Sequence, residues 1–217
     1  AHEASFSTSL KSRLPTIRAM AFEANPHIYQ VHVERLRQSA PGVDYRNMAI
    51  ASRDGFVPMH IPIKQGGTSI GPHNGIGSLL RRIRPGFEYE TLSVPALSLD
   101  NALSAFAMDR SVAWIDVEGA QGEILAGGRH FFSKVAAIYI EVERAQVWSD
   151  QKLDSEIAAS LAGHSLVPVM RDNLASRQYN EVYIRADGAV AEKALPVASR
   201  YIEQLRRLID PHGPGVV

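Results

Sequence analysis

Residues 111–125 read S-V-A-W-I-D-V-E-G-A-Q-G-E-I-L. The first part is a short apolar run bounded by polar residues, which is typical of a buried strand. Asp116 follows that run directly, and Gly119 lets the chain turn sharply before the apolar spacing of a helix begins. This stretch therefore predicts a strand, a turn and a helix, with a carboxylate at the end of the strand.

Strand-like and helix-like segments alternate on both sides of this stretch. Further strands are expected at 16–22, 43–51, 92–99, 134–142, 165–170 and 181–185, and helices at 4–14, 26–40, 101–108, 152–162 and 190–209. Such alternation favours an α/β fold with a mostly parallel sheet covered by helices on both faces. The last two strands lack a good helix between them, so we expect an antiparallel hairpin at one edge.

The middle of the chain departs from this alternation. Asp54-Gly55 lies between two apolar runs, which is a hairpin signal. Pro58 and Pro62 confine the returning run to a sheet edge or to an excursion away from the sheet. The glycine-rich segment 64–78 predicts a mobile loop that forms a lid or a substrate wall, and residues 79–84 have the spacing of one or two helical turns.

Composition describes an ordinary globular chain. Of its 217 residues, 45% are hydrophobic and 21% are charged, which excludes a disordered or collagen-like protein. Lys plus Arg and Asp plus Glu both number 23, so the net charge is zero and no nucleic-acid partner is expected. The absence of cysteine excludes disulfide scaffolds, thiolate metal sites and a cysteine nucleophile.

The length favours one domain, which we place at 1–210 and follow with a loose C-terminal tail at 211–217. No run approaches the roughly 20 apolar residues of a membrane helix, so no membrane span is expected. We expect a cytoplasmic protein.

Acids at strand ends are the first candidate site residues, because ligands of an open α/β sheet bind beyond the carboxyl ends of its strands. Glu23 can accept hydrogen bonds from ribose hydroxyls, or it is a surface acid near a helix N-terminus. Asp116 either faces the expected crevice or caps the next helix, and Glu118 is better placed for that cap.

Glu141 and His73 are candidates for proton transfer. Glu141 ends a buried strand and either orients a substrate or acts as a general base, unless it pairs with Arg144 or Arg171. His73 lies in the glycine-rich loop, where a histidine is usually only solvent-exposed. Nearby, Gly75-Ile-Gly77 lacks the third glycine of a dinucleotide fingerprint and follows no buried strand. The Walker A, H-E-x-x-H, G-x-S-x-G and EF-hand patterns are absent from the sequence.

Taken in order, several segments resemble the FkbM-type methyltransferases. W-I-D-V-E-G-A-Q-G-E-I-L-A-G-G at 114–128 is similar to the family signature K-I-D-V-E-G-A-E-x-x-V-L-x-G, and A-F-E-A-N-P at 21–26 is similar to its F-E-P-x-P segment. A-A-I-Y-I-E-V at 136–142, N-M-A-I at 47–50 and Q-Y-N-E-V-Y at 178–183 fit other strands of the family. The resemblance covers about residues 1–186, and D-V-E-G-A-Q is its most specific part.

The resemblance implies a class I methyltransferase, with a Rossmann-like, doubly wound fold that binds S-adenosyl-L-methionine. It implies methyl transfer to oxygen, often a hydroxyl of a sugar or of a glycosylated natural product. By position, Glu23 would hold the ribose, residues 47–49 would lie near the adenine, and Asp116 would lie near the methyl group. The full set of expected cofactor-binding residues is Ala1, His2, Glu23, Asn25, Asn47, Ala49 and Asp116.

The protein's own task in such a reaction is to align the acceptor and take its proton. The candidate catalytic bases are Glu141, Asp116 and His73, in that order, and no metal is expected. The alternative is a Mg²⁺-assisted reaction in which Asp116 and either Glu118 or Glu141 hold the ion. The acceptor is expected to be a small molecule or a carbohydrate, and the oligomeric state stays open.

The sequence departs from the family pattern in two places. Gln121 stands where the family usually has Glu. The family's D-x-G-A-N-x-G turn, which follows its first strand, is matched only at its end by A-H-E-A-S-F-S at 1–7. We therefore expect the first strand to lie upstream of Ala1 in a longer natural protein. Two other functions stay open, a non-catalytic Rossmann-like binding module and an N-methyltransferase.

Overall fold

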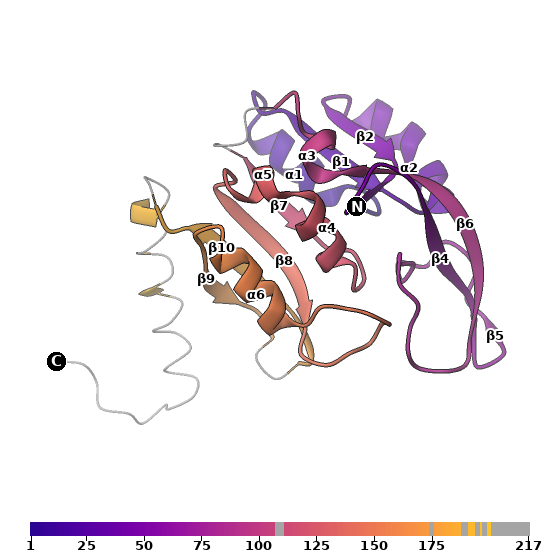
Figure 1. Ribbon diagram of the computed structural model, residues 1–217. Coiled ribbons are helices and arrows are strands. Elements are labelled where there is room, and N and C mark those ends of the chain that lie inside the picture. The colour runs from indigo at the N-terminus through magenta and orange to yellow at the C-terminus, as the bar shows by residue number, and fades with distance from the viewer. Residues whose placement is uncertain (107–110, 174–175, 188–190, 194–195, 197–198, 201–217) are drawn as a thin grey trace.

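The computed structural model describes residues 1–106, 111–173, 176–187, 191–193, 196 and 199–200 (Figure 1). In chain order the elements are α1 (Ser5–Arg13), β1 (Ala19–Glu23), α2 (Pro26–Ser39), β2 (Val43–Asn47), β3 (Ala49–Ala51), β4 (Gly55–Gln65), β5 (Thr68–Ser69), β6 (Phe87–Ser98), α3 (Leu99–Ala102), β7 (Val112–Ile115), α4 (Gln121–Gly127), α5 (Arg129–Phe132), β8 (Ala137–Glu143), α6 (Asp154–Ala162), β9 (Leu166–Arg171) and β10 (Gln178–Arg185).

The described strands form three hydrogen-bonded sheets, with the orders β1-β2, β7-β8-β10-β9 and β3-β6-β4-β5. The pairs β1-β2, β3-β6 and β7-β8 are parallel, whereas β10 runs antiparallel to both β8 and β9. The expected α/β class and the antiparallel pair near the end of the chain are therefore confirmed. The Rossmann-like, doubly wound arrangement stays a prediction, because β1 and β7 belong to different sheets among the described residues. The strand expected upstream stays a prediction.

Local sequence signals explain the start of α2. The Asn25 side chain accepts a hydrogen bond from the His27 amide at 3.0 Å, and Pro26 occupies the first helical position. The helix buries Ile28, Val33 and Leu36, and it packs on β1 and β2. This packing fixes the carboxyl end of β1, where Glu23 lies.

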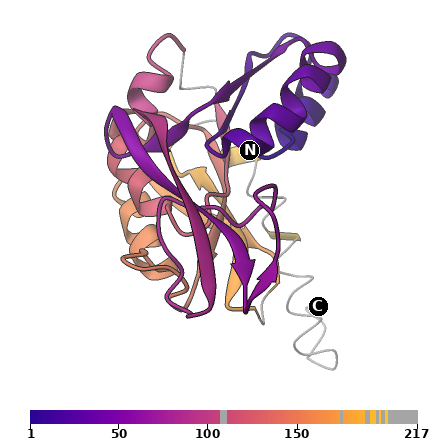
Figure 2. The ribbon, with the colours of Figure 1, turned by 90° about the vertical axis from the view of Figure 1, so that its right-hand side faces the viewer.

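The main core lies between the sheet β7-β8-β10-β9 and the helices α4, α5 and α6. Ile138, Ile140 and Val142 alternate along β8 and point into this core, in contact with apolar residues of the three helices. Figure 2 shows these helices on one side of the molecule and α1 and α2 on the other. The packing holds the carboxyl ends of β7 and β8 next to each other.

The excursion at 52–86 differs from its expected form. Ala96 of β6 pairs with both Ala49 of β3 and Gly55 of β4, so β6 separates the two strands that Asp54-Gly55 was expected to join. The hairpin prediction is wrong because the long-range partner β6 takes the position between them. β4 instead pairs antiparallel with β6, and the hairpin that does form joins β4 to β5.

Residues 79–84 form no helix, which corrects the helical expectation for them. Their main chain pairs with a segment distant in sequence instead: Arg82 forms an isolated bridge with Trp148, and the Ile83 amide donates to the Val147 carbonyl. The helix expected at 101–108 is the short α3, and part of that range lies outside the described residues. Most of the predicted helix at 190–209 and all of the tail at 211–217 also lie outside them. In the described part of the chain, no helix is long and apolar enough to cross a membrane.

Candidate active site

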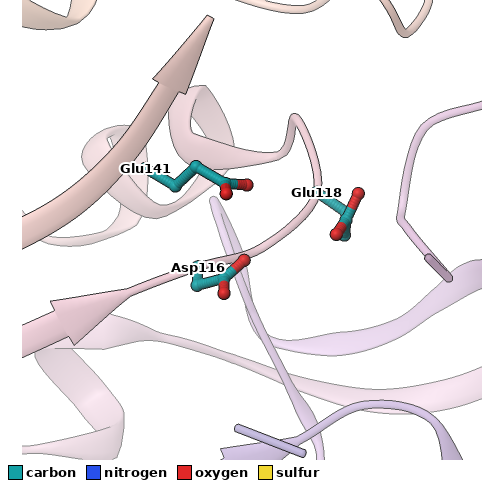
Figure 3. Close-up of side chains that lie close together, drawn as sticks. All are labelled: Asp116, Glu118 and Glu141. Carbon is teal, nitrogen blue, oxygen red and sulfur yellow. The ribbon is translucent and has the colours of Figure 1, made fainter. Parts of the chain in front are cut away.

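A cluster of carboxylates, which we call the acid cluster, lies where β7 and β8 end. It consists of Asp116 after β7, Glu118 in the following turn and Glu141 near the end of β8. One carboxylate oxygen from each residue lies within 4.8 Å of the others. The side chains converge on a common space in Figure 3. The parallel register, in which Ile115 pairs with Ile140, brings Asp116 and Glu141 together as the sequence predicted.

A strained turn places Glu118 in this cluster. Glu118 has a φ of 50° and Gly119 a φ of 88°, and a Cβ at Gly119 would lie 2.7 Å from the ring of Trp148. Only glycine therefore fits at the second position. The Glu118 carboxylate lies 3.4 Å from the Arg82 guanidinium, and its carbonyl accepts a hydrogen bond from the Ser78 hydroxyl at 2.6 Å.

Glu118 does not cap the next helix, which corrects one sequence expectation. Ala120 precedes α4, and no side chain makes a capping hydrogen bond there. The left-handed backbone at Glu118 points its side chain into the acid cluster instead. Non-glycine residues seldom adopt this conformation, so the sequence V-E-G did not predict it.

Burial and mutual repulsion make the carboxylates of the cluster weak acids. Burial raises the pKa of Glu118 to about 8, and the negative charges of Glu141 and Asp116 add to the rise. Burial also raises the pKa of Glu141 to about 7, again with a contribution from Asp116. A carboxyl group that titrates near neutrality can take up a proton from a bound acceptor.

A glutamine holds Glu141 in place. The Gln178 side-chain amide donates to Glu141 Oε2 at 2.7 Å and to Glu143 Oε1 at 3.3 Å. Glu143 is only 1% exposed, and its other oxygen accepts a hydrogen bond from Gln151. Arg144, which the sequence offered as a partner for Glu141, lies 3.7 Å from Asp154 instead.

Gln121, the residue that departs from the family pattern, supports the same strand. It is 1% exposed, and its Nε2 donates to the Glu141 carbonyl at 2.9 Å. An ionised glutamate has no hydrogen to donate, so it could not replace this bond. The amide therefore ties the first turn of α4 to the end of β8.

A second group of expected site residues meets at the end of β1. Glu23 is 7% exposed, and its Oε1 accepts from the Asn25 amide at 2.7 Å. Its Oε2 accepts from the His2 amide at 2.6 Å and from the Ala1 ammonium group at 3.1 Å. The structure therefore brings Ala1, His2, Glu23 and Asn25 together.

The remaining expected residues have structural contacts of their own. Asn47 Nδ2 donates to the Glu23 carbonyl at 2.8 Å, and Ala49 is 3% exposed at the start of β3. The Asn25 side chain, besides capping α2, donates to the Pro72 carbonyl at 2.9 Å and so holds the glycine-rich loop. His73 makes an edge-on ring contact with His27, with 5.9 Å between centroids, which places it beside the start of α2.

The family model of the methyltransferase FkbM domain matches residues 1–181. The chain belongs to this family. The matched range includes Glu23 and all three residues of the acid cluster. This FkbM-domain protein is therefore a methyltransferase, and the resemblance seen in the sequence is confirmed. A search of the curated proteins found no significant match, and neither did a search of the solved structures.

Proposed function

We propose that the protein transfers a methyl group from S-adenosylmethionine to a hydroxyl group of a sugar or of a glycosylated small molecule, with Glu141 as the general base. The observation that carries this proposal is the acid cluster, in which Glu141 titrates near pH 7 at the carboxyl end of a strand. Hydroxyl groups are poor nucleophiles until a base accepts their proton.

The residues at the ends of β1 and β7 suit such a cofactor chemically. When bound, S-adenosylmethionine supplies a methyl group on a positively charged sulfur, already activated for transfer. The Asp116 carboxylate provides negative charge toward that part of the molecule. Glu23 accepts three N–H hydrogen bonds, and a carboxylate has about four acceptor positions, so one position on Oε1 is left for a ribose hydroxyl.

The same electrostatics favour an oxygen acceptor over a nitrogen acceptor. An amine must lose its proton before it can attack, and carboxylates nearby raise the pKa of an ammonium group. The acid cluster would therefore hold an amine in its unreactive, protonated form. A neutral hydroxyl carries no such penalty and gains a proton acceptor in Glu141.

A second candidate role for the acid cluster is to bind a divalent cation. The carboxylate oxygens lie within 4.8 Å of one another, a spacing that allows a hard cation to bind them. In that case Asp116, Glu118 and Glu141 would hold the ion, and the ion would orient the acceptor. Loss of activity in EDTA with recovery on adding Mg²⁺ would favour this mechanism over proton transfer to a free Glu141.

Calorimetric titration with S-adenosylhomocysteine tests the cofactor, and a panel of acceptors tests the substrate class. We expect binding of S-adenosylhomocysteine, and methyl transfer from labelled S-adenosylmethionine to sugars but not to matched amino sugars at their nitrogen. Methylation at nitrogen would overturn the choice of oxygen. A failure to bind, in the full chain and in any longer natural form, would overturn the choice of cofactor.

A further inference from the structure

Residues 78–83, which we call the strap, join β4 to the segment that follows β8. At one end Ser78 exchanges two main-chain hydrogen bonds with His60 of β4, at 2.8 and 3.0 Å. At the other end the Ile83 amide donates to the Val147 carbonyl at 2.9 Å. Main-chain hydrogen bonds therefore fix the strap at both of its ends, beside the acid cluster.

Two contacts from the strap hold Glu118. The Ser78 hydroxyl donates to the Glu118 carbonyl at 2.6 Å, and the Arg82 guanidinium lies 3.4 Å from the Glu118 carboxylate. The side chains of Arg82 and Glu118 are only 20% and 19% exposed, so salt and water screen their attraction less than that of a surface pair. The strap thus holds both the main chain and the side chain of Glu118.

Two aromatic rings keep the Arg82 guanidinium in place. Its central carbon lies 4.7 Å from the centroid of the Trp148 ring and 5.5 Å from the centroid of the Phe87 ring, and such rings attract a cation electrostatically. Trp148 also packs closely against Gly119, where a Cβ would lie 2.7 Å from the ring. Arg82, Trp148 and the turn that carries Glu118 therefore form one packed unit.

The charge of Arg82 favours the inward position of Glu118. One carboxylate oxygen of Glu118 lies within 4.8 Å of those of Asp116 and Glu141, and like charges at this separation repel one another. Outside the acid cluster the Glu118 carboxylate would be hydrated and farther from the other two acids. The ion pair with Arg82 supplies the attraction that opposes this outward movement.

The placement of Arg82 has a cost that stability alone does not explain. Its Nε is buried and has no hydrogen-bond partner among the described residues. A buried donor without a partner is unfavourable, and apolar side chains often replace a buried ion pair without loss of stability. We propose that Arg82 is a positioning residue for methyl transfer, which holds Glu118 in the acid cluster so that the Glu118 carboxyl group binds the acceptor next to Glu141. This role rests on the proposed function, which places the acceptor at the acid cluster.

A double-mutant cycle in the kinetics of methyl transfer tests this role. Arg82→Gln and Glu118→Gln are each expected to lower kcat/KM for the acceptor by roughly 10- to 100-fold, because a small displacement of a positioning group can cost about 10²-fold. In the Glu118→Gln background, Arg82→Gln should cause no further loss, because Arg82 acts through Glu118. Losses that multiply in the double variant would overturn the proposal, since they would show that Arg82 acts without Glu118. An unchanged kcat/KM in Arg82→Gln would overturn it as well.

Two further variants complete the comparison. Arg82→Lys keeps the positive charge and is expected to retain more of kcat/KM than Arg82→Gln, and equal losses in the two would contradict the role of the charge. The control Arg84→Gln changes an exposed arginine directly after the strap and should match the parent. The affinity for S-adenosylhomocysteine, measured by calorimetry, should be the same in all of these variants.

Tryptophan fluorescence tests the position of Arg82 without any acceptor. The chain has two tryptophans, so in Trp114→Phe the emission comes from Trp148 alone, which is 1% exposed. Adding Arg82→Gln should uncover the Trp148 ring and increase its quenching by acrylamide, whereas a variant that fails to fold would show the emission of a fully exposed tryptophan. Quenching equal to that of Trp114→Phe itself would overturn the proposal.

The role of Arg82 and the proposed function fail in different ways. A parent protein that methylates only nitrogen contradicts the proposed oxygen acceptor, and the cycle is then measured with that nitrogen acceptor. Losses that multiply, with either kind of acceptor, contradict the role of Arg82 and leave the choice of acceptor untouched.

Discussion

Glu141 combines the properties that a base in methyl transfer requires. It lies at the end of a buried strand, and burial together with the negative charge of Asp116 raises its pKa to about 7. Replacing it by glutamine keeps the shape of the side chain and the hydrogen bond from the Gln121 side chain to the main-chain carbonyl of residue 141, while removing the proton acceptor.

We therefore expect Glu141→Gln to lower kcat by about 10²- to 10⁴-fold, the usual contribution of a general base. The affinity for S-adenosylhomocysteine should change little, because Glu23, the residue proposed to hold the ribose, lies at the end of β1 and outside the acid cluster. Single-turnover methylation and calorimetry together check this expectation. A variant with unchanged kcat would assign the proton transfer to another group, with Asp116 the next candidate.

Gln178 is expected to tune this base. Its hydrogen bond to Glu141 stabilises the ionised carboxylate and so opposes the rise of the Glu141 pKa. In Gln178→Met that stabilisation is lost, and the rise of kcat/KM with pH should move to higher pH. Glu181→Gln serves as the control, because Glu181 lies on the same strand but accepts its hydrogen bond from Tyr183 on the opposite face. Coincident pH profiles for Gln178→Met and the parent would contradict the tuning role.

For single residues, the sequence predicted which side chains lie at strand ends better than it predicted which residues they contact. Asp116 and Glu141 were predicted because each follows an apolar run, and the acid cluster contains both. The place of Glu118 depends on a left-handed backbone angle, and the role of Gln178 depends on pairing with β8 across a long sequence separation. Neither property leaves a local pattern that a single sequence reveals.

Among the elements, α4 depends on the absence of a side chain at one position. A Cβ on Gly127 would lie 2.1 Å from the Ala51 carbonyl oxygen, which belongs to the main chain of β3 and cannot move alone. Gly122 in the same helix meets only the side chain of Lys152, at 2.8 Å, and a lysine side chain can turn away.

Gly127→Ala is thus expected to destabilise the protein by about 1–3 kcal/mol, the range for an overpacked contact. Gly122→Ala should be neutral or should stabilise by up to about 1 kcal/mol, because alanine favours a helix interior. Urea unfolding of both variants measures the difference. Equal midpoints for the two variants would show that α4 does not approach β3 closely.

Elements with strong signals of their own were predicted well, whereas those defined by a distant partner were not. The start of α2 follows from Asn25 and Pro26, and β8 follows from its own apolar run. The expected hairpin at Asp54-Gly55 was wrong because β6 inserts between its two strands. Asp54 itself accepts hydrogen bonds from Ser98 and Asn101, so the turn is held by residues more than forty positions away.

The acid cluster should also govern the stability of the whole molecule as a function of pH. The pKa of Glu118 is raised to about 8 and that of Glu141 to about 7, whereas unfolded glutamates titrate near about 4.3. Below that pH both states are protonated and the cluster carries no penalty. Above that pH the glutamates of the unfolded chain ionise while those of the folded protein stay protonated. The free energy of unfolding therefore falls as the pH rises toward about 8.

The melting temperature is accordingly expected to fall between about pH 5 and pH 8. For a chain of this size, each kcal/mol lost from the free energy of unfolding lowers the melting temperature by about 2–4 °C. Glu118→Gln should flatten this decline. Glu34→Gln, at an exposed ion pair on α2, should leave it unchanged. Thermal unfolding, followed by circular dichroism at several pH values, tests this expectation. A melting temperature that rises over this pH interval would contradict the burial of the acid cluster.

The strand order β7-β8-β10-β9 has a consequence for biosynthesis. β10 is the last of these strands to be made, yet it lies between β8 and β9 and supplies the described sheet partner of β9. While the ribosome is still producing residues 178–185, β9 has no place in the sheet and the free edge of β8 is open to other chains. A nascent chain in this state is the form most exposed to aggregation. Slow translation of residues 178–185 would prolong that exposure, and chaperones would act on the chain until β10 has paired with β8 and β9.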